Sequence, residues 1–223
     1  MQATPARVLG PKDGRAGFLG SIGVRFMING GESGGGFSLV EHPMSARALA
    51  APLHRHTRED EYSYVVEGRI GALLGDDVVF GAPGDLIFKP RNQWHTFWNA
   101  GDEPARLLEI ISPAGFEQFF SELVELGGVT QADPAILGAL SARYGLEMDP
   151  QSIPGLLQRF KLRVPGEPVE RPAIVDGKSG RVSLRRWIMN RYLILEFSAT
   201  LVRHSTVLSR VLHSANACAY EEL

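Results

Sequence analysis

The chain has 223 residues, of which 44% are hydrophobic and 22% are charged, which is ordinary usage for a globular protein. The formal net charge of −2 offers no electrostatic basis for binding nucleic acid or an anionic membrane surface. The single cysteine, Cys218, excludes both an intrachain disulfide and a thiolate metal cluster.

The first zone, residues 18–112, consists of short apolar runs bounded by turn residues such as Asn29-Gly30-Gly31 and Ala82-Pro83-Gly84. No long helical pattern interrupts this zone. Many short strands at a spacing of about 8–12 residues are typical of an all-β sandwich or barrel. The predicted strands are 24–28, 37–41, 52–56, 61–66, 69–74, 77–80, 85–89, 95–99 and 106–112.

The second zone, residues 113–163, changes to helical periodicity. Apolar side chains recur at spacings of three and four between Phe116 and Leu126, and Gly127-Gly128 follows. A second short helix is predicted at 134–144, with Asp133 as its N-cap. We expect this helical extension to cover the barrel or a dimer face.

The third zone, residues 166–223, follows a linker-like run that begins at Pro165-Gly166. Its apolar runs lack convincing caps, and the sequence assigns this tail no fold and no role. The whole chain has no signal-peptide pattern and no apolar run long enough for a transmembrane helix, so we expect a cytoplasmic protein.

The stretch PLHRHTREDEYSYVVEG, residues 52–68, places two histidines one residue apart. Side chains at positions i and i+2 of a strand share one face, so His54 and His56 point the same way and Arg55 points the other. Burying two imidazoles is costly unless their nitrogens have a partner, which a divalent metal provides. Glu61 returns a carboxylate to the same point, and His95 on a later strand supplies a fourth donor.

Three imidazoles and one carboxylate suit a first-row divalent metal: Fe(II), Mn(II), Ni(II), Cu(II) or Zn(II). Four protein ligands on an octahedral metal would leave two positions for substrate, water or O₂. Glu59 and Asp60, beside Glu61, are interpreted as solvated charges of the turn. The other histidines, His42, His204 and His213, have no partner at ligand spacing.

The spacing of these residues resembles the two-part signature of the cupin superfamily. The first part is His54-x-His56-x4-Glu61-x6-Gly68, and the second is Gly84-x5-Pro90-x-Asn92-x2-His95-x3-Asn99. Asn92 replaces the usual second glycine of the second part, a mild change because asparagine tolerates a left-handed turn. Ala48 stands where the first part usually has its leading glycine, which affects only a turn.

The resemblance implies a cupin-type β-barrel, a jelly roll also called a double-stranded β-helix, with a metal held by His54, His56, Glu61 and His95. The chain is most similar to small single-domain cupins that look like quercetin 2,3-dioxygenase. This implies a metal-dependent oxygenase for a small enol or phenolic substrate, in which Glu61 also serves as a base. Two alternatives remain: a cupin isomerase or decarboxylase, and a metal-binding sensor or storage module without turnover.

Aromatic residues near His95 are either substrate contacts or barrel core. Alternation places Phe97 and Asn99 on the His95 face of their strand, which makes them the predicted pocket residues. Trp94 and Trp98 are predicted on the opposite face, and with Tyr62 they favour a homodimer. The expected partners are therefore a small-molecule substrate and a second copy of the chain, with no nucleic acid and no membrane.

Overall fold

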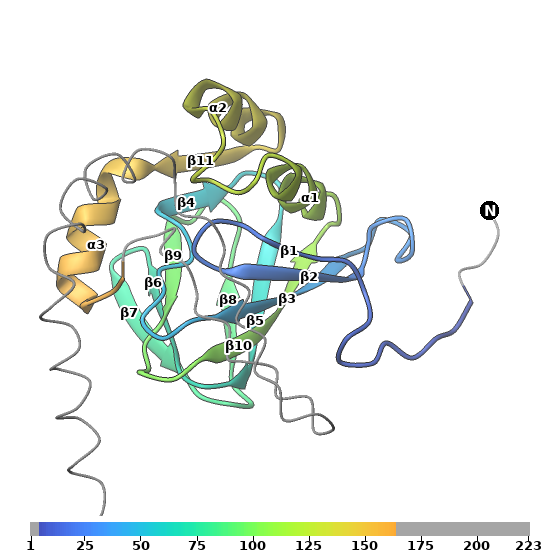
Figure 1. The fold of residues 1–223 in the computed structure, drawn as a ribbon, viewed down its shortest axis with the longest axis horizontal. Helices are drawn as coiled ribbons and strands as arrows, with labels where there is room; N and C mark the ends of the chain where they lie inside the picture. Colours follow the sequence, from blue (N-terminus) through green and yellow to red (C-terminus); the bar gives the residue numbers. More distant parts are fainter. Residues whose placement is uncertain (1–4, 164–223) are drawn as a thin grey trace, which may run out of the picture. The chain divides into compact units, whose positions relative to one another are not determined.

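The computed structural model describes residues 5–163, so the predicted tail at 166–223 lies outside the described residues. Two antiparallel sheets form the body of this part of the chain (Figure 1). The six-stranded sheet has the order β1 (Ala16–Phe18), β2 (Gly23–Ile28), β3 (Ser38–Met44), β10 (Ala105–Ser112), β5 (Asp60–Glu67) and β8 (Leu86–Lys89). The five-stranded sheet has the order β11 (Leu146–Asp149), β4 (Leu53–His56), β9 (His95–Asn99), β6 (Ile70–Leu74) and β7 (Asp77–Gly81). The all-β barrel fold predicted from the sequence is confirmed.

Alternation along the strands decides which side chains enter the barrel. In β10, Ala105, Leu107, Glu109 and Ile111 are buried, while the residues between them are half-buried. Each inward row packs on the opposite sheet, and one continuous apolar core results. The strand that begins at Asp60 follows the same rule, so a carboxylate at its second residue faces the interior.

A helix covers the outer face of one sheet, whereas aromatic side chains remain exposed on the outer face of the other. The helix α3 (Ile153–Phe160) packs on the five-stranded sheet, where the ring centroids of Phe160 and Trp98 are 4.0 Å apart. Trp98 is only 1% exposed, so it is not available to a second copy of the chain. The six-stranded sheet keeps Tyr64 and Phe88 exposed, and the homodimer stays a prediction.

The extension after β10 contains more than the two predicted helices. These are α1 (Glu117–Glu125), which lies beside β1–β3, and α2 (Pro134–Arg143), which lies beside β11 (Figure 1). The strand β11 and the short 3-10 helix η1 (Pro150–Ser152), which lead into α3, were not predicted. Asp133 caps α2 as predicted, because its side chain accepts the N–H of Ala135 at 2.7 Å. No helix among residues 5–163 combines the length and apolar character needed to cross a membrane.

Candidate metal centre

Three strands bring the four predicted ligands together inside the barrel. His54 and His56 lie on β4, Glu61 on β5 and His95 on β9, where His95 is the direct cross-strand partner of His54. All four side chains are buried, and one donor atom from each lies within 4.8 Å of all the others. Residues that are 41 positions apart in the chain thus share one small polar site.

Backbone carbonyls fix the ring orientation of two of the histidines. Nδ1 of His54 is 2.9 Å from the Pro52 carbonyl oxygen, and Nδ1 of His95 is 2.9 Å from the Gln93 carbonyl oxygen. A carbonyl oxygen only accepts, so each Nδ1 carries the hydrogen, and in the neutral ring the lone pair that a metal can use is on Nε2. Metal-binding histidines are commonly oriented in this way. The donor set therefore fits a divalent first-row metal.

His56 differs from the other two histidines. Its Nδ1 has no hydrogen-bond partner among the described residues, and neither does Oε2 of Glu59, although the two atoms are only 3.7 Å apart. Glu59 is 5% exposed, so its interpretation as a solvated turn charge was wrong. The turn places this carboxylate beside His56, just beyond hydrogen-bond distance. Asp60 is half-buried and pairs with Arg91 at 2.8 Å.

The turn before His95 is built as the sequence motif requires. Asn92 has φ 65°, the left-handed conformation that asparagine tolerates better than most residues. Its N–H donates to the carbonyl oxygen of His56 at 2.7 Å. Asparagine in place of glycine thus preserves the turn. The turn also connects β9, which carries His95, to β4, which carries His54 and His56.

A charged cluster beside Glu61 was not predicted from the sequence. Lys89 Nζ lies 3.0 Å from Oε2 of Glu61 and 2.9 Å from Oε2 of Glu109, which also accepts the Ser63 hydroxyl at 2.8 Å. The Lys89 side chain has no exposed surface. Strand alternation could have predicted this burial. Lys89 lies two residues after the buried Ile87, and Glu109 lies between the buried Leu107 and Ile111 on the same face of its strand.

Burial and neighbouring charges set the protonation of the site. Burial holds the pKa of His54 well below 6.5 and lowers that of His95, which keeps both rings in the neutral form that binds metals. Burial alone would raise the pKa of Glu61, but His56, the Lys89 ammonium and His95 hold it well below 4.5. For Lys89, burial opposes the charge while Glu109 and Glu61 raise the pKa above 10.5. Burial raises the pKa of Glu109 to about 7.

The helical extension closes the site with aromatic rings. The Phe116 ring lies edge-on to His56 with centroids 4.2 Å apart, and Phe119 stacks on Phe116 at 5.0 Å. Phe116 is 2% exposed. Phe116 thus covers the site on the side of His56.

The two predicted pocket residues have different surroundings. Phe97 is buried, and its ring centroid lies 4.4 Å from Lys89 Nζ, on the side of the proposed ligands. Both N–H groups of the Asn99 amide are used, by the carbonyl oxygens of Ser45 and Glu103. Its amide oxygen accepts the N–H of Gly101 at 2.8 Å. Asn99 thus holds a turn and has no free N–H for a substrate.

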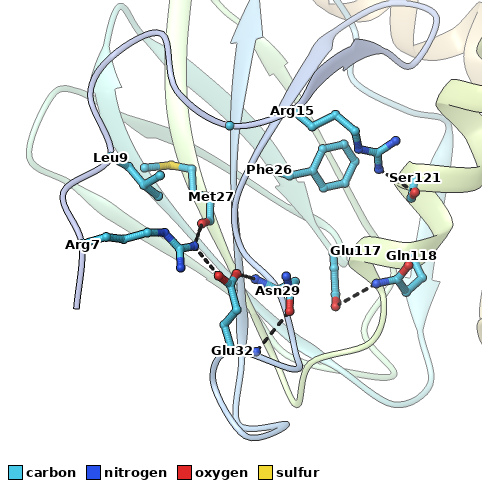
Figure 2. A pocket seen from close by; sticks show the side chains of 11 residues that line it. Arg7, Leu9, Arg15, Phe26, Met27, Asn29, Glu32, Glu117, Gln118 and Ser121 are labelled. Carbon is cyan, nitrogen blue, oxygen red and sulfur yellow. Dashed lines mark hydrogen bonds and ion pairs between the residues drawn. The ribbon is translucent and has the colours of Figure 1, made fainter. Parts of the chain in front are cut away.

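A separate cavity of about 320 Å³ lies between the N-terminal segment, β2 and α1. Figure 2 shows Arg7 directed toward Glu32 and Arg15 toward Ser121, with the Phe26 ring between the two pairs. The cavity contains none of the four proposed ligands among its lining residues. It is therefore distinct from the polar site inside the barrel.

Part of the barrel matches a known domain family. Residues 44–111 match the family model of the cupin domain. An RmlC-like cupin from Shewanella frigidimarina is 18% identical, with a TM-score of 0.43 over 52% of this chain and 99% of that one. A sugar phosphate isomerase of the cupin superfamily from Silicibacter pomeroyi is 20% identical, with a TM-score of 0.42 over 48% and 75%. No match was found among curated proteins.

A third solved structure, the polyketide cyclase RemF from Streptomyces resistomycificus, is 26% identical, with a TM-score of 0.42 over 48% of this chain and 80% of that one. Similarity at these values carries no conclusion about activity. The family match covers the segment that carries all four proposed ligands. Together with the two-sheet architecture, it supports a place in the cupin superfamily for the barrel of this chain.

Proposed function

We propose that the barrel is a metal-dependent enzyme, an oxygenase that acts on a small enol or phenolic substrate. The observation that carries the metal site is the convergence of four buried donors within 4.8 Å. A bound first-row metal would act as a Lewis acid that lowers the pKa of a substrate oxygen and, if redox-active, would support O₂ chemistry.

The residues of the chain itself have distinct tasks in this proposal. Nε2 of each histidine and a carboxylate oxygen of Glu61 would hold the metal. Phe97 and Phe116 form apolar walls that orient an aromatic substrate and keep water away from it. The lowered pKa of Glu61 keeps it ionised, which favours a ligand role over a base role, because a general base works best with a pKa near the operating pH.

A second candidate uses the same donors for proton transfer, as an isomerase or decarboxylase. Glu109 favours it, because a buried carboxyl with a pKa raised to about 7 is able to hold and release a proton near the operating pH. This candidate requires no O₂. A metal-binding module without turnover is the remaining outcome.

The first experiment is elemental analysis of the purified full-length protein, beside the His54→Ala/His56→Ala double variant. We expect near-stoichiometric first-row metal that is lost in the variant. Arg55→Ala is the matched control, since Arg55 lies on the other face of β4 and pairs with Glu147 at 2.7 Å. No metal in the wild type, even after reconstitution with Fe, Mn, Ni, Cu and Zn, would refute the site.

The second experiment separates the candidate reactions. O₂ consumption is measured with flavonols and other stable enols, and product formation is compared in air and under nitrogen. The oxygenase predicts consumption of O₂ that depends on both metal and substrate. Turnover that is equal under nitrogen would favour the isomerase or decarboxylase, and binding without turnover would favour the non-catalytic module.

A further inference from the structure

The buried ammonium of Lys89 needs an explanation that barrel stability does not provide. An ion pair removed from water loses more hydration energy than the attraction between its charges usually returns. A hydrophobic residue at this position would serve the core as well, and Ile87 does so two residues earlier on β8. The reason for a buried charge at this position must therefore lie in the contacts that Lys89 makes.

Lys89 contacts a proposed ligand directly. Oε2 of Glu61 lies 3.0 Å from Nζ of Lys89 and 3.2 Å from Nε2 of His95, whereas Oε1 lies 3.4 Å from Nε2 of His56. Glu61 and Lys89 are direct cross-strand partners on β5 and β8. The ammonium thus approaches the carboxylate from the strand beside it, and the histidines face it from the opposite sheet.

Lys89 is itself held by a second pair of cross-strand neighbours, Ser63 and Glu109. Oε2 of Glu109 accepts from both the ammonium and the Ser63 hydroxyl, at 2.9 Å and 2.8 Å. The Phe97 ring lies 4.4 Å from Nζ and completes the surroundings. A flexible four-carbon side chain is therefore fixed at its charged end, which a purely space-filling residue would not require.

We propose that Lys89 is a positioning residue that fixes the Glu61 carboxylate toward the three histidines, and that Glu109 and Ser63 hold Lys89 in place. This inference rests on the metal site of the proposed function and adds the device that orients its only carboxylate. Oε2 of Glu61 contacts both Lys89 and His95, while Oε1 faces His56, so the ammonium fixes the plane of the carboxylate.

The test compares the wild type with Lys89→Met/Glu109→Gln, which removes one positive and one negative charge and leaves no buried carboxylate without a partner. The dissociation constant for Co(II) is measured by competition with a chelator, and the visible spectrum of the Co(II) protein reports ligand geometry. We expect binding to weaken by about 10- to 100-fold, the usual effect of losing an outer-shell partner, together with a changed spectrum.

A double-mutant cycle shows whether the effect passes through Glu61. The same substitutions are made in the Glu61→Gln background, where we expect them to change the dissociation constant by less than about threefold. Ser63→Ala, a milder change in the same cluster, should weaken binding in the same direction by a smaller factor. Arg25→Met is the control, because Arg25 pairs with Glu41 at 2.5 Å, where neither residue is a proposed ligand.

The outcomes separate this inference from the proposed function. A wild type that binds no Co(II) overturns the metal site and the role of Lys89 with it. A wild type that binds Co(II), with an unchanged spectrum or an equal effect in both backgrounds, overturns only the role of Lys89. Reduced stability with unchanged Co(II) binding would likewise show that the cluster is only structural.

Discussion

The six-stranded sheet carries a buried ionic cluster on each of its two faces, and the two clusters differ in their access to water. In the outer cluster, Glu41 accepts from Arg25 and from Arg106, whose side chain is 40% exposed. In the inner cluster, the Lys89 ammonium lies between Glu61 and Glu109 and has no exposed surface. Glu41 is thus paired with a cation that water reaches, whereas Glu109 is paired with a cation that water does not reach.

Under our proposal, this difference separates a structural ion pair from one that serves the metal site. Arginine offers several donors in a fixed plane and is weakly hydrated, which suits a pair at a sheet surface. Lysine is strongly hydrated, so its complete burial is expensive and is usually linked to a task. The four predictions below test the contrast, in order of decreasing expected effect.

The largest effect concerns a carboxylate left without its partner. Lys89→Met should lower the free energy of unfolding of the metal-free protein by about 3–5 kcal/mol, because Glu109 stays buried without a counter-charge. Adding Glu109→Gln should restore most of this loss. Urea unfolding measures both variants. Equal destabilisation of the single and double variants would show that packing, rather than charge, makes the inner cluster important.

The next effect concerns His42, an ionisable residue in the interior that, unlike Lys89, is in contact with no charged side chain among the described residues. Burial, with a smaller contribution from Lys89, lowers the pKa of His42 from 6.5 to about 4, against raising effects of the Gly23 carbonyl, Glu61 and Glu41. The folded state therefore binds the proton less readily than the unfolded chain. Stability from this residue is complete above pH 6.5 and is lost as the pH falls toward 4, by about 3 kcal/mol in total.

His42→Asn tests this pH dependence. The asparagine amide can still donate to the Gly23 carbonyl oxygen, which His42 Nδ1 contacts at 2.8 Å, but it does not titrate. The difference in unfolding free energy between wild type and variant, measured with metal-free protein, should shrink between pH 7 and pH 4. A difference that is constant over this range would contradict the burial argument.

A smaller effect is expected in the outer cluster. Arg25→Met should cost about 1 kcal/mol, because Arg106 still pairs with Glu41 and water reaches the site. Part of that cost comes from the N-terminal segment, since Arg25 also donates to the carbonyl oxygens of Gly10 and Asp13. The difference from wild type should decrease in high salt. A loss as large as that of Lys89→Met would remove the distinction between the two clusters.

The smallest effect concerns the ring that seals the inner site. Phe116→Leu should cost less than about 1.5 kcal/mol, as conservative apolar exchanges usually do. It should nevertheless speed the removal of metal by a chelator several-fold, because Phe116 lies 4.2 Å from His56. Phe119→Leu is the matched control and should leave this rate unchanged. Equal rates for all three proteins would place the access route elsewhere.

The sequence predicted that the four proposed ligands converge, because their signal is local. Alternation on a strand and fixed spacing around the Pro90 turn determine where His54, His56 and His95 point. Lys89 and Glu109 were missed, although the same alternation applies to them, because a charged residue between apolar ones usually indicates a strand's outer face. Only the pairing of β5 with β8 and β10 shows that these rows face inward.

Features that depend on long-range packing were not predictable in the same way. The short strand β11 has the sequence LEMD, which carries no clear strand pattern, and its pairing with β4 creates it. The burial of Trp98 depends on Phe160, which is distant in the chain. Glu59 becomes buried because its turn folds against His56. In each case the surroundings of the residue depend on a segment distant in the sequence or on the geometry of a turn.

The pairing of β11 has a consequence for where the folding unit ends. The ladder of β4 with β9 contains one residue pair, His54 with His95, whereas its ladder with β11 contains four. A fragment cut at residue 111, where the cupin match ends, would leave the strand of two proposed ligands with an open edge. On the ribosome, this strand gains its second neighbour only after residue 149 has emerged. We therefore expect the smallest autonomous unit to be longer than the family match, and the hydrogen bond from the Arg163 N–H to the Arg47 carbonyl oxygen ties the end of the described residues to the barrel.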